Sequence, residues 1–182
     1  MSVVVGLVKD GHVYMAADTR CLEGYEKTTA KKLFAKKHLQ WGTWAIGVVG
    51  YSRNTEIAAE LDLKTLKSED KRKTTIPQLC RGYFDALREE ISDRGVLKDC
   101  DAESAFLLAV KGRLFQTDPT FCMTEITTLI AIGTGAPYAE ATLWALQTYC
   151  PDMPPEQMVR TAVDAAIHFN VSVGGEIEVV VI

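Results

Sequence analysis

Three parts of this 182-residue sequence hold residue types that could carry chemistry. The hydroxyl of Ser2 follows Met1 directly and precedes a β-branched, apolar run to Val8. A glycine-rich turn, GTGAP, occupies residues 133–137, and five cysteines are spread along the chain. A hydroxyl can act as a nucleophile, a glycine-rich turn can hold phosphate, and cysteines can bind metal or form disulfides.

The spacing of the cysteines and of the turn argues against two of these chemistries. The cysteines form no CxxC pair and no cluster with histidine, which argues against zinc. Their odd number and the missing secretory segment indicate reduced thiols in a cytoplasmic protein, each acting as a small apolar residue. The GTGAP turn falls short of a dinucleotide fingerprint. We therefore expect no metal, no nucleotide and no other cofactor. The cysteines are Cys21, Cys80, Cys100, Cys122 and Cys150.

Length and charge predict a single globular domain over residues 1–182. A chain of this size buries about 70% of its unfolded surface. The net charge of −4 and pI near 5.4 give no basic field for nucleic acid or an anionic membrane. No apolar run approaches the roughly 20 residues of a membrane span. We expect neither nucleic acid nor membrane as a partner.

The elements that must position Ser2 begin with a hairpin. Residues 2–8 and 12–18 are predicted strands, and Asp10-Gly11 is a strong signal for the turn between them. Chain ends are usually loose, so a first residue placed inside a sheet is unusual. The predictions that follow are a polar loop over 19–29, a short strand over 30–35 and a buried strand over 42–50.

Four helices are predicted in two pairs. The first pair covers 54–66 and then Thr75 to the residue before Gly95, separated by a charged turn over 68–75. The second pair covers 137–149 and a helix opening at Pro154-Pro155. The expected buried stripes are Ile57, Ala58, Leu61 and Leu66; Leu79, Tyr83, Leu87 and Ile91; Ala139, Leu143 and Leu146; and Met158, Ala162, Ala166 and Phe169.

Strands also separate and follow the helix pairs. Residues 104–118 predict a hairpin turning at Lys111-Gly112, and 127–133 and 176–182 predict further strands. Grouped strands and helices favour two antiparallel sheets with helices outside rather than βαβ alternation. The predicted fold is therefore α+β, a four-layer αββα sandwich.

Four segments in this order resemble proteasome β-type subunits and their HslV-type relatives among the N-terminal nucleophile hydrolases. They are a small hydroxyl residue followed by VVVGLVKDGHVYMAADTR, then TTAKKLF, AIGVVG and LIAIGTGAPYA. The resemblance runs over the whole chain, and it implies the same αββα sandwich. It also implies that the first residue, once free, is the nucleophile and that its own α-amine is the base. An α-amine has a pKa of about 8, far better suited to neutral pH than a lysine near 10.

The resemblance assigns further roles by position. Ser2 would be the nucleophile after removal of Met1. Asp18 and Lys32 match the family's catalytic aspartate and lysine, the lysine keeping the neighbouring amine neutral and favouring loss of the hydroxyl proton. Gly50 matches the glycine whose N–H holds the oxyanion. Thr134 falls where the family commonly has a serine beside the nucleophile.

The chain also departs from the family pattern. Ser2 replaces the usual threonine, whose extra methyl restricts χ1. Asn170 stands where many proteasome subunits carry an aspartate, and Tyr51 follows Gly50 in place of a small residue, which could narrow the substrate groove. The positions matching the pocket for the residue before the scissile bond are apolar, which favours a hydrophobic substrate side chain, although core packing explains them equally well. They are Ala30, Val48 and Val49.

The resemblance implies a self-compartmentalising peptidase that forms homo-oligomeric stacked rings and cuts polypeptides, with an ATP-dependent unfoldase as a possible partner. Two alternatives remain open. One is a ring-forming scaffold subunit that keeps the fold with little or no turnover. The other is an amidase of the same nucleophile class acting on a small amide, since a fold does not decide function.

Overall fold

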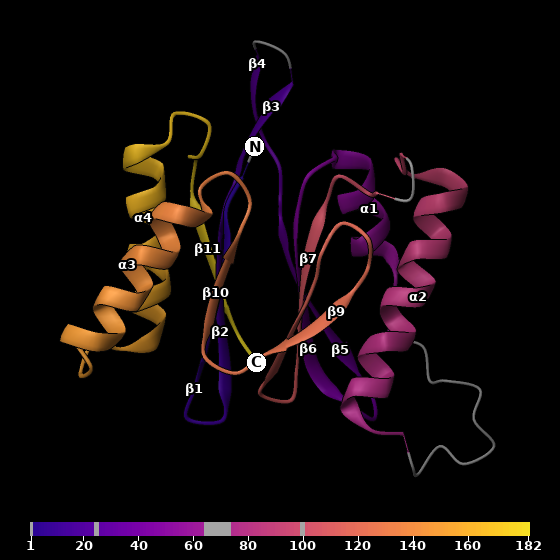
Figure 1. Cartoon of the computed structure of the whole chain (residues 1–182), viewed down its shortest axis with the longest axis horizontal. Helices are drawn as coiled ribbons and strands as arrows, with labels where there is room; N and C mark the ends of the chain where they lie inside the picture. Colours follow the sequence, from indigo (N-terminus) through magenta and orange to yellow (C-terminus); the bar gives the residue numbers. More distant parts are fainter. Residues whose placement is uncertain (1, 24–25, 64–73, 99–100) are drawn as a thin grey trace.

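Two antiparallel sheets lie face to face, and a pair of helices covers the outer face of each (Figure 1). This computed structural model describes residues 2–23, 26–63, 74–98 and 101–182. The layers follow the order helices, sheet, sheet, helices. The predicted α+β four-layer sandwich is therefore confirmed.

The first sheet has the strand order β10-β1-β2-β11 and holds the start of the chain at its centre. Its strands are β1 Val4–Lys9, β2 His12–Asp18, β10 Leu129–Ile132 and β11 Ile177–Val181. Asp10 and Gly11 close the β1–β2 hairpin with φ of 52° and 75°, the left-handed geometry that such a turn requires. Because β1 pairs with both β2 and β10, the residues behind Met1 are held on two sides.

The second sheet has the order β5-β6-β7-β8-β9. Its strands are β5 Leu33–His38, β6 Gly42–Val49, β7 Ala105–Val110, β8 Arg113–Thr117 and β9 Met123–Ile126. The β7–β8 turn falls at Lys111-Gly112, as predicted. The first strand of this sheet runs over 33–38 rather than the predicted 30–35. The edge strand β9 was not predicted, because a four-residue run with two exposed polar residues carries no apolar alternation.

Residues 20–29 correct another expectation. The predicted loop over 19–29 is wrong, since β3 Arg20–Glu23 and β4 Glu26–Thr29 pair as a hairpin. This hairpin extends beyond the end of the sandwich (Figure 1). A hairpin outside the layers has no core face to impose apolar alternation, so its sequence is indistinguishable from that of a polar loop.

The helices are α1 Ser52–Glu60, α2 Ile76–Arg94, α3 Ala136–Tyr149 and α4 Pro155–Phe169. The first helix ends at Glu60, so the prediction that it continues is wrong over 61–63, where buried Leu61 and Leu63 continue the chain outside the helix. Residues 64–66 of that prediction, and most of the charged turn over 68–75, lie outside the described residues. The second helix begins and ends as predicted. The Thr75 N–H donates to Gln78 Oε1 at 2.9 Å ahead of its first turn.

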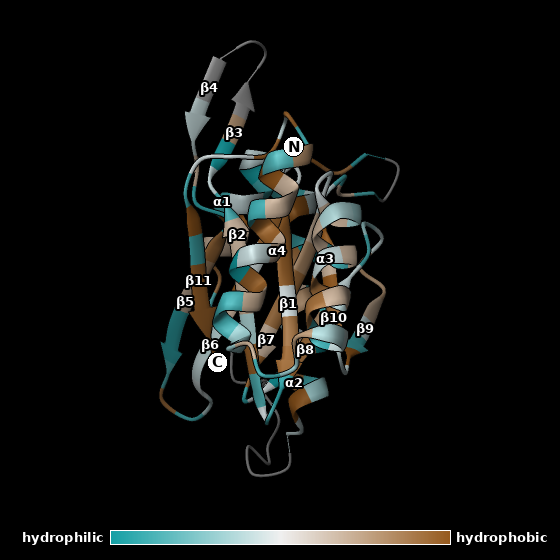
Figure 2. Cartoon of the chain, turned by 90° about the vertical axis from the view of Figure 1, so that its left-hand side faces the viewer, coloured by the Kyte–Doolittle hydropathy of each residue, from teal (hydrophilic) through white to brown (hydrophobic). Residues whose placement is uncertain are grey.

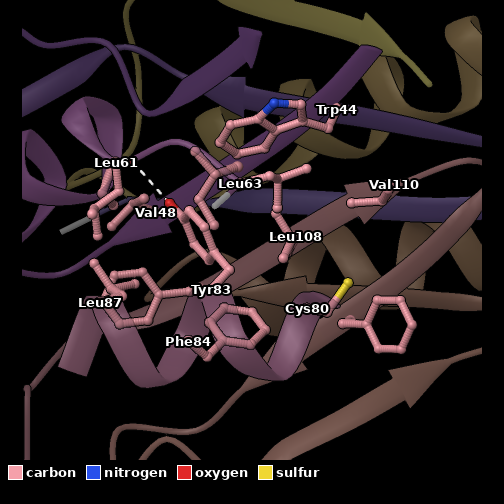
Figure 3. Packing of buried hydrophobic residues seen from close by; sticks show 14 of the residues in the cluster. Trp44, Val48, Leu61, Leu63, Cys80, Tyr83, Phe84, Leu87, Leu108 and Val110 are labelled. Carbon is pink, nitrogen blue, oxygen red and sulfur yellow. Dashed lines mark hydrogen bonds between the residues drawn. The ribbon is translucent and has the colours of Figure 1, made fainter. Parts of the chain in front are cut away.

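Each gap between layers has its own apolar core. Tyr83 of α2 packs among Trp44, Phe84 and Leu108, and its hydroxyl donates to the Ala58 carbonyl at 2.9 Å (Figure 3). Burial raises the pKa of Tyr83 well above its ordinary range. Val4, Met15 and Leu107 are among the residues buried between the sheets.

The α3 and α4 helices cover the first sheet and pack apolar side chains against it (Figure 2). The outer side of α3 also carries exposed aromatic side chains, Trp144 and Tyr149. Met158, Ala162 and Ala166 are buried as predicted, but Phe169 is 65% exposed. Its ring stacks on exposed Tyr138 at a centroid distance of 5.8 Å. The helix ends at Phe169, so this ring lies at the rim of the layer rather than over the core. In the described part of the chain, no helix has both the length and the apolar character to cross a membrane.

Candidate active site

Asp18, the last residue of β2, is fully buried and accepts hydrogen bonds from three directions. Its Oδ1 accepts from the Val3 N–H at 2.9 Å and from Lys32 Nζ at 2.7 Å, and its Oδ2 accepts from the Gly174 N–H at 3.0 Å. A buried carboxylate is tolerated only when it is paired and hydrogen-bonded in this way. Asp18 therefore ties the start of β1 to the residue before β5 and to the turn before β11.

Lys32 immediately precedes β5, and its side chain is 6% exposed. Its Nζ donates to Asp18 and to the Arg20 carbonyl at 2.6 Å. Burial lowers the pKa of Lys32 from its ordinary 10.5, and Asp18 opposes that effect by stabilising the ammonium. Lys32 is therefore a positive charge held in one place, and burial makes it lose its proton at a lower pH than an exposed lysine would.

Ser2 lies just ahead of β1 and is 6% exposed. Its N–H lies 3.3 Å from Thr134 Oγ1, and its carbonyl accepts from the Gly135 N–H at 3.2 Å. Gly133 has φ of 95°, and a Cβ there would collide with the Ser2 carbonyl oxygen. The GTGAP turn therefore packs against the chain's own first residues, which accounts for its glycines without a phosphate ligand.

Asn170 is connected to Ser2 through Thr134. It follows α4 and donates from Nδ2 to the Thr134 carbonyl at 2.9 Å, while its Oδ1 accepts from the Ser172 N–H at 3.0 Å. Its amide therefore holds the turn that holds Ser2. Like Asp18, Asn170 lines neither of the cavities described below, and its hydrogen bond to Thr134 is its link to the other residues singled out from the sequence.

Gly50 directly follows β6 and lines two cavities, of about 770 Å³ and 390 Å³, both of which also include Ser2 in their linings. Lys32 lines the larger cavity and Thr134 the smaller. The structure thus brings four of the six predicted residues, Ser2, Lys32, Gly50 and Thr134, to the walls of two cavities that share Ser2. The fifth, Asp18, lies behind these walls and holds Lys32.

The three apolar positions predicted to form one pocket are divided between the cavities. Ala30 and Val48 line the larger, and Val49 lines the smaller. Successive residues of a strand point to opposite faces, so Val48 and Val49 could not share one wall. The larger cavity also includes Phe34 and Cys21, which the sequence analysis missed. Phe34 lies two residues beyond Lys32 on the same side of β5, and this spacing was the signal available for it.

Nothing in the described residues points to a metal or a disulfide. No group of three or more histidine, cysteine, aspartate or glutamate side chains is arranged there to hold an ion. The four described cysteines are all free; they are Cys21, Cys80, Cys122 and Cys150.

The family model for proteasome subunits matches residues 2–182. The chain belongs to the proteasome subunit family. A search of curated proteins found no match.

Solved structures place this proteasome subunit among known folds. BPH of Thiobacillus denitrificans is 20% identical with a TM-score of 0.78, the alignment covering 99% of this chain and 97% of BPH. HslV of Trypanosoma brucei is 18% identical with a TM-score of 0.69 and 98% coverage of both chains. Anbu of Yersinia bercovieri is 20% identical with a TM-score of 0.78, covering 99% of this chain and 81% of Anbu. At these identities the likeness concerns the fold.

Proposed function

We propose that this proteasome subunit is a peptidase whose nucleophile is Ser2, exposed by removal of Met1. The observation that carries the proposal is the gathering of Ser2, Lys32 and Gly50 on one cavity, with Lys32 held by buried Asp18. This gathering supplies a hydroxyl, a neighbouring positive charge and a backbone N–H for a developing oxyanion, which are the parts that acyl transfer requires.

The reaction runs through an ester intermediate. The Ser2 α-amine takes the proton of the Ser2 hydroxyl as Oγ attacks the peptide carbonyl carbon. The Gly50 N–H stabilises the resulting oxyanion, and the ammonium then returns its proton to the departing amine as the C–N bond breaks. Water attacks the ester carbonyl carbon and gives a proton to the α-amine. The C–Oγ bond then breaks, the ammonium returns that proton to Oγ, and the carboxylic acid is released. The amine and the hydroxyl are both regenerated.

Lys32 and Thr134 set up the first of these steps. The Lys32 ammonium disfavours a second positive charge nearby, so the α-amine stays neutral and able to act as a base. The Thr134 hydroxyl lies within hydrogen-bonding distance of the same nitrogen and orients it. The Asp18 carboxylate keeps Lys32 in place and charged.

The cavities suggest how a polypeptide is held. Ala30, Phe34 and Val48 give the larger cavity apolar walls suited to a hydrophobic side chain before the scissile bond, and the smaller cavity would take the residue after it. We propose that the sites lie inside homo-oligomeric stacked rings in the cytoplasm, supplied by an ATP-dependent unfoldase. A helical assembly of the Anbu complex from Pseudomonas aeruginosa is among the solved structures of similar fold.

Intact mass spectrometry with and without a peptide epoxyketone tests the proposal. BPH of Thiobacillus denitrificans has been solved in complex with epoxomicin, which makes this a suitable probe class. We expect the mass to show loss of Met1 and one adduct per chain, abolished in Ser2→Ala. Retained Met1 with no adduct would instead identify a scaffold subunit of the same fold.

A further inference from the structure

Gly50 is packed directly against a segment that lies more than fifty residues away in the sequence. Its φ is 122°, a conformation that favours glycine. A Cβ at this position would lie 2.6 Å from the Glu103 carbonyl oxygen and would collide with Ser104 Oγ. The backbone of Gly50 therefore has residues 103 and 104 as its immediate wall.

Ser104 fixes the peptide that follows Gly50. This serine is 3% exposed, and its Oγ accepts from the Tyr51 N–H at 3.2 Å. The other side of Gly50 continues β6, which is paired with β5 and β7. The Gly50 N–H belongs to the peptide that joins Gly50 to the end of β6. The strand holds this peptide on one side, and the Ser104 hydroxyl holds the next peptide on the other, so together they set the backbone angles of Gly50 and the direction of its N–H.

Asn54 in turn holds Ser104. It lies in α1, is fully buried, and its Nδ2 lies 3.2 Å from Ser104 Oγ and 2.9 Å from each of the Val96 and Ala102 carbonyl oxygens. Its Oδ1 accepts from the Val96 N–H at 2.8 Å. One amide therefore joins α1, the chain leaving α2 and the segment that forms the wall of Gly50.

We propose that Asn54, acting through Ser104, is a positioning residue that aims the Gly50 N–H at the oxyanion. Asn54 lines neither cavity and so does not touch substrate, whereas Ser104 lines the smaller one. The inference rests on the proposed function, because it assigns Gly50 the oxyanion. A small misdirection of such a donor weakens the transition state more than it weakens substrate binding.

A purely structural role predicts something different. Loss of a buried hydrogen bond would then lower stability and leave the turnover of the folded enzyme unchanged. Tyr83→Phe is the matched control, since it removes one buried hydrogen bond, to the Ala58 carbonyl, in the same layer, and neither Tyr83 nor Ala58 lines a cavity.

The test compares Ser104→Ala, Asn54→Asp and Tyr83→Phe with the parent enzyme. Ser104→Ala removes the acceptor, and Asn54→Asp keeps the acceptor for Val96 but loses the amide donor. We expect kcat to fall about tenfold in Ser104→Ala with KM unchanged. The affinity for a peptide aldehyde, which forms a tetrahedral adduct with Ser2, should fall by the same factor. Tyr83→Phe should lower the melting temperature alone.

Two results would overturn the inference. One is a kcat for Ser104→Ala equal to that of the parent; the other is a crystal structure of Ser104→Ala in which the Gly50 peptide has not turned. The crystal structure decides the matter even if the parent carries no adduct on Ser2, an outcome that would reject the proposed function separately. If Asn54→Asp fails to fold, Ser104→Ala still provides the test.

Discussion

Two opposing effects act on the Lys32 ammonium. Burial removes water from it and lowers its pKa, while Asp18 at 2.7 Å and the Arg20 carbonyl stabilise its charge. A lysine in this position releases its proton at a lower pH than an exposed lysine does. If the mechanism needs that charge, the pKa of Lys32 sets the alkaline limit of the enzyme.

The first prediction is therefore a bell-shaped pH profile of kcat/KM. Activity should rise as the α-amine becomes neutral, at a pH below its ordinary pKa of about 8, because the Lys32 ammonium disfavours a second positive charge nearby. It should fall as Lys32 loses its proton, at a pH below 10.5. Between the lowered pKa and 10.5 the unfolded chain binds more protons, so this group makes the free energy of unfolding rise with pH. Loss of the Lys32 proton therefore does not unfold the enzyme, and unfolding from this cause cannot explain the fall of kcat/KM at high pH. A plateau that continues beyond pH 10.5 in peptide hydrolysis assays would remove Lys32 from the mechanism.

Replacing the lysine gives the second prediction. Lys32→Ala should lower kcat by at least about a hundredfold, because the amine base and the hydroxyl both lose their neighbouring charge. It also leaves the buried Asp18 carboxylate with two backbone N–H donors and no counter-ion, so the melting temperature should fall as well. Lys37→Ala, on the exposed side of β5, is the control and should match the parent in both measurements. Turnover by Lys32→Ala at the rate of the control would contradict the assignment.

At the scale of elements, the end of α4 is tied to the turn before α3. Asn170 donates to the Thr134 carbonyl, and an aspartate could not donate this bond. The family pattern suggests that aspartate should be acceptable here, whereas the geometry of this chain predicts that asparagine is required.

The third prediction concerns Asn170→Asp. Two acceptors would then face each other, so the free energy of unfolding should fall by about 1 kcal/mol and kcat should fall with the displacement of Thr134. Asn170→Ala, which loses the bond without adding a charge, should show a smaller loss in both. Urea titration and peptide hydrolysis measure the two effects. A variant Asn170→Asp that is as stable and active as the parent would show that the family's residue fits this site equally well.

The sequence was sufficient to predict the layers but not every strand. Buried elements carry a strong periodic signal, as in α2, where Leu79, Tyr83, Leu87 and Ile91 are all buried as expected. The β3–β4 hairpin and β9 lie at the edge of or outside the layers, where no buried face shapes the sequence. The end of α1 was missed because Leu61 and Leu63 are buried outside the helix, so apolar spacing alone suggested a longer one.

The residues of the candidate site were predicted from the resemblance, position by position. The residues that hold them in place, Asn54 and Ser104, were not predicted. Ser2, Asp18 and Lys32 stand at recognisable places in strands and turns. Asn54 and Ser104 come together from segments fifty residues apart, and no local pattern announces a contact of that kind. The division of Val48 and Val49 between two cavities, by contrast, follows from strand alternation and was available from the sequence.

At the scale of the whole molecule, the outer surface carries large apolar side chains. Trp144, Tyr149 and Phe169 of the α3–α4 pair are 55%, 72% and 65% exposed. Exposed aromatic surface is unfavourable in water, at about 25 cal/mol per Å², so a lone subunit leaves free energy to be gained by association. A peptidase with an open cavity would also act on any unfolded chain it met, and enclosure within an assembly prevents this.

The fourth prediction is that the purified protein sediments as a multiple of its 20.1 kDa chain mass. Sedimentation velocity over a range of concentrations should give one large species, and electron microscopy should show closed rings in stacks. Lys32→Ala should assemble to the same mass, because its side chain faces the cavity rather than the outer surface. A 20.1 kDa monomer that still hydrolyses peptides would reject self-compartmentalisation while leaving the Ser2 mechanism in place. A monomer without an adduct on Ser2 would reject both.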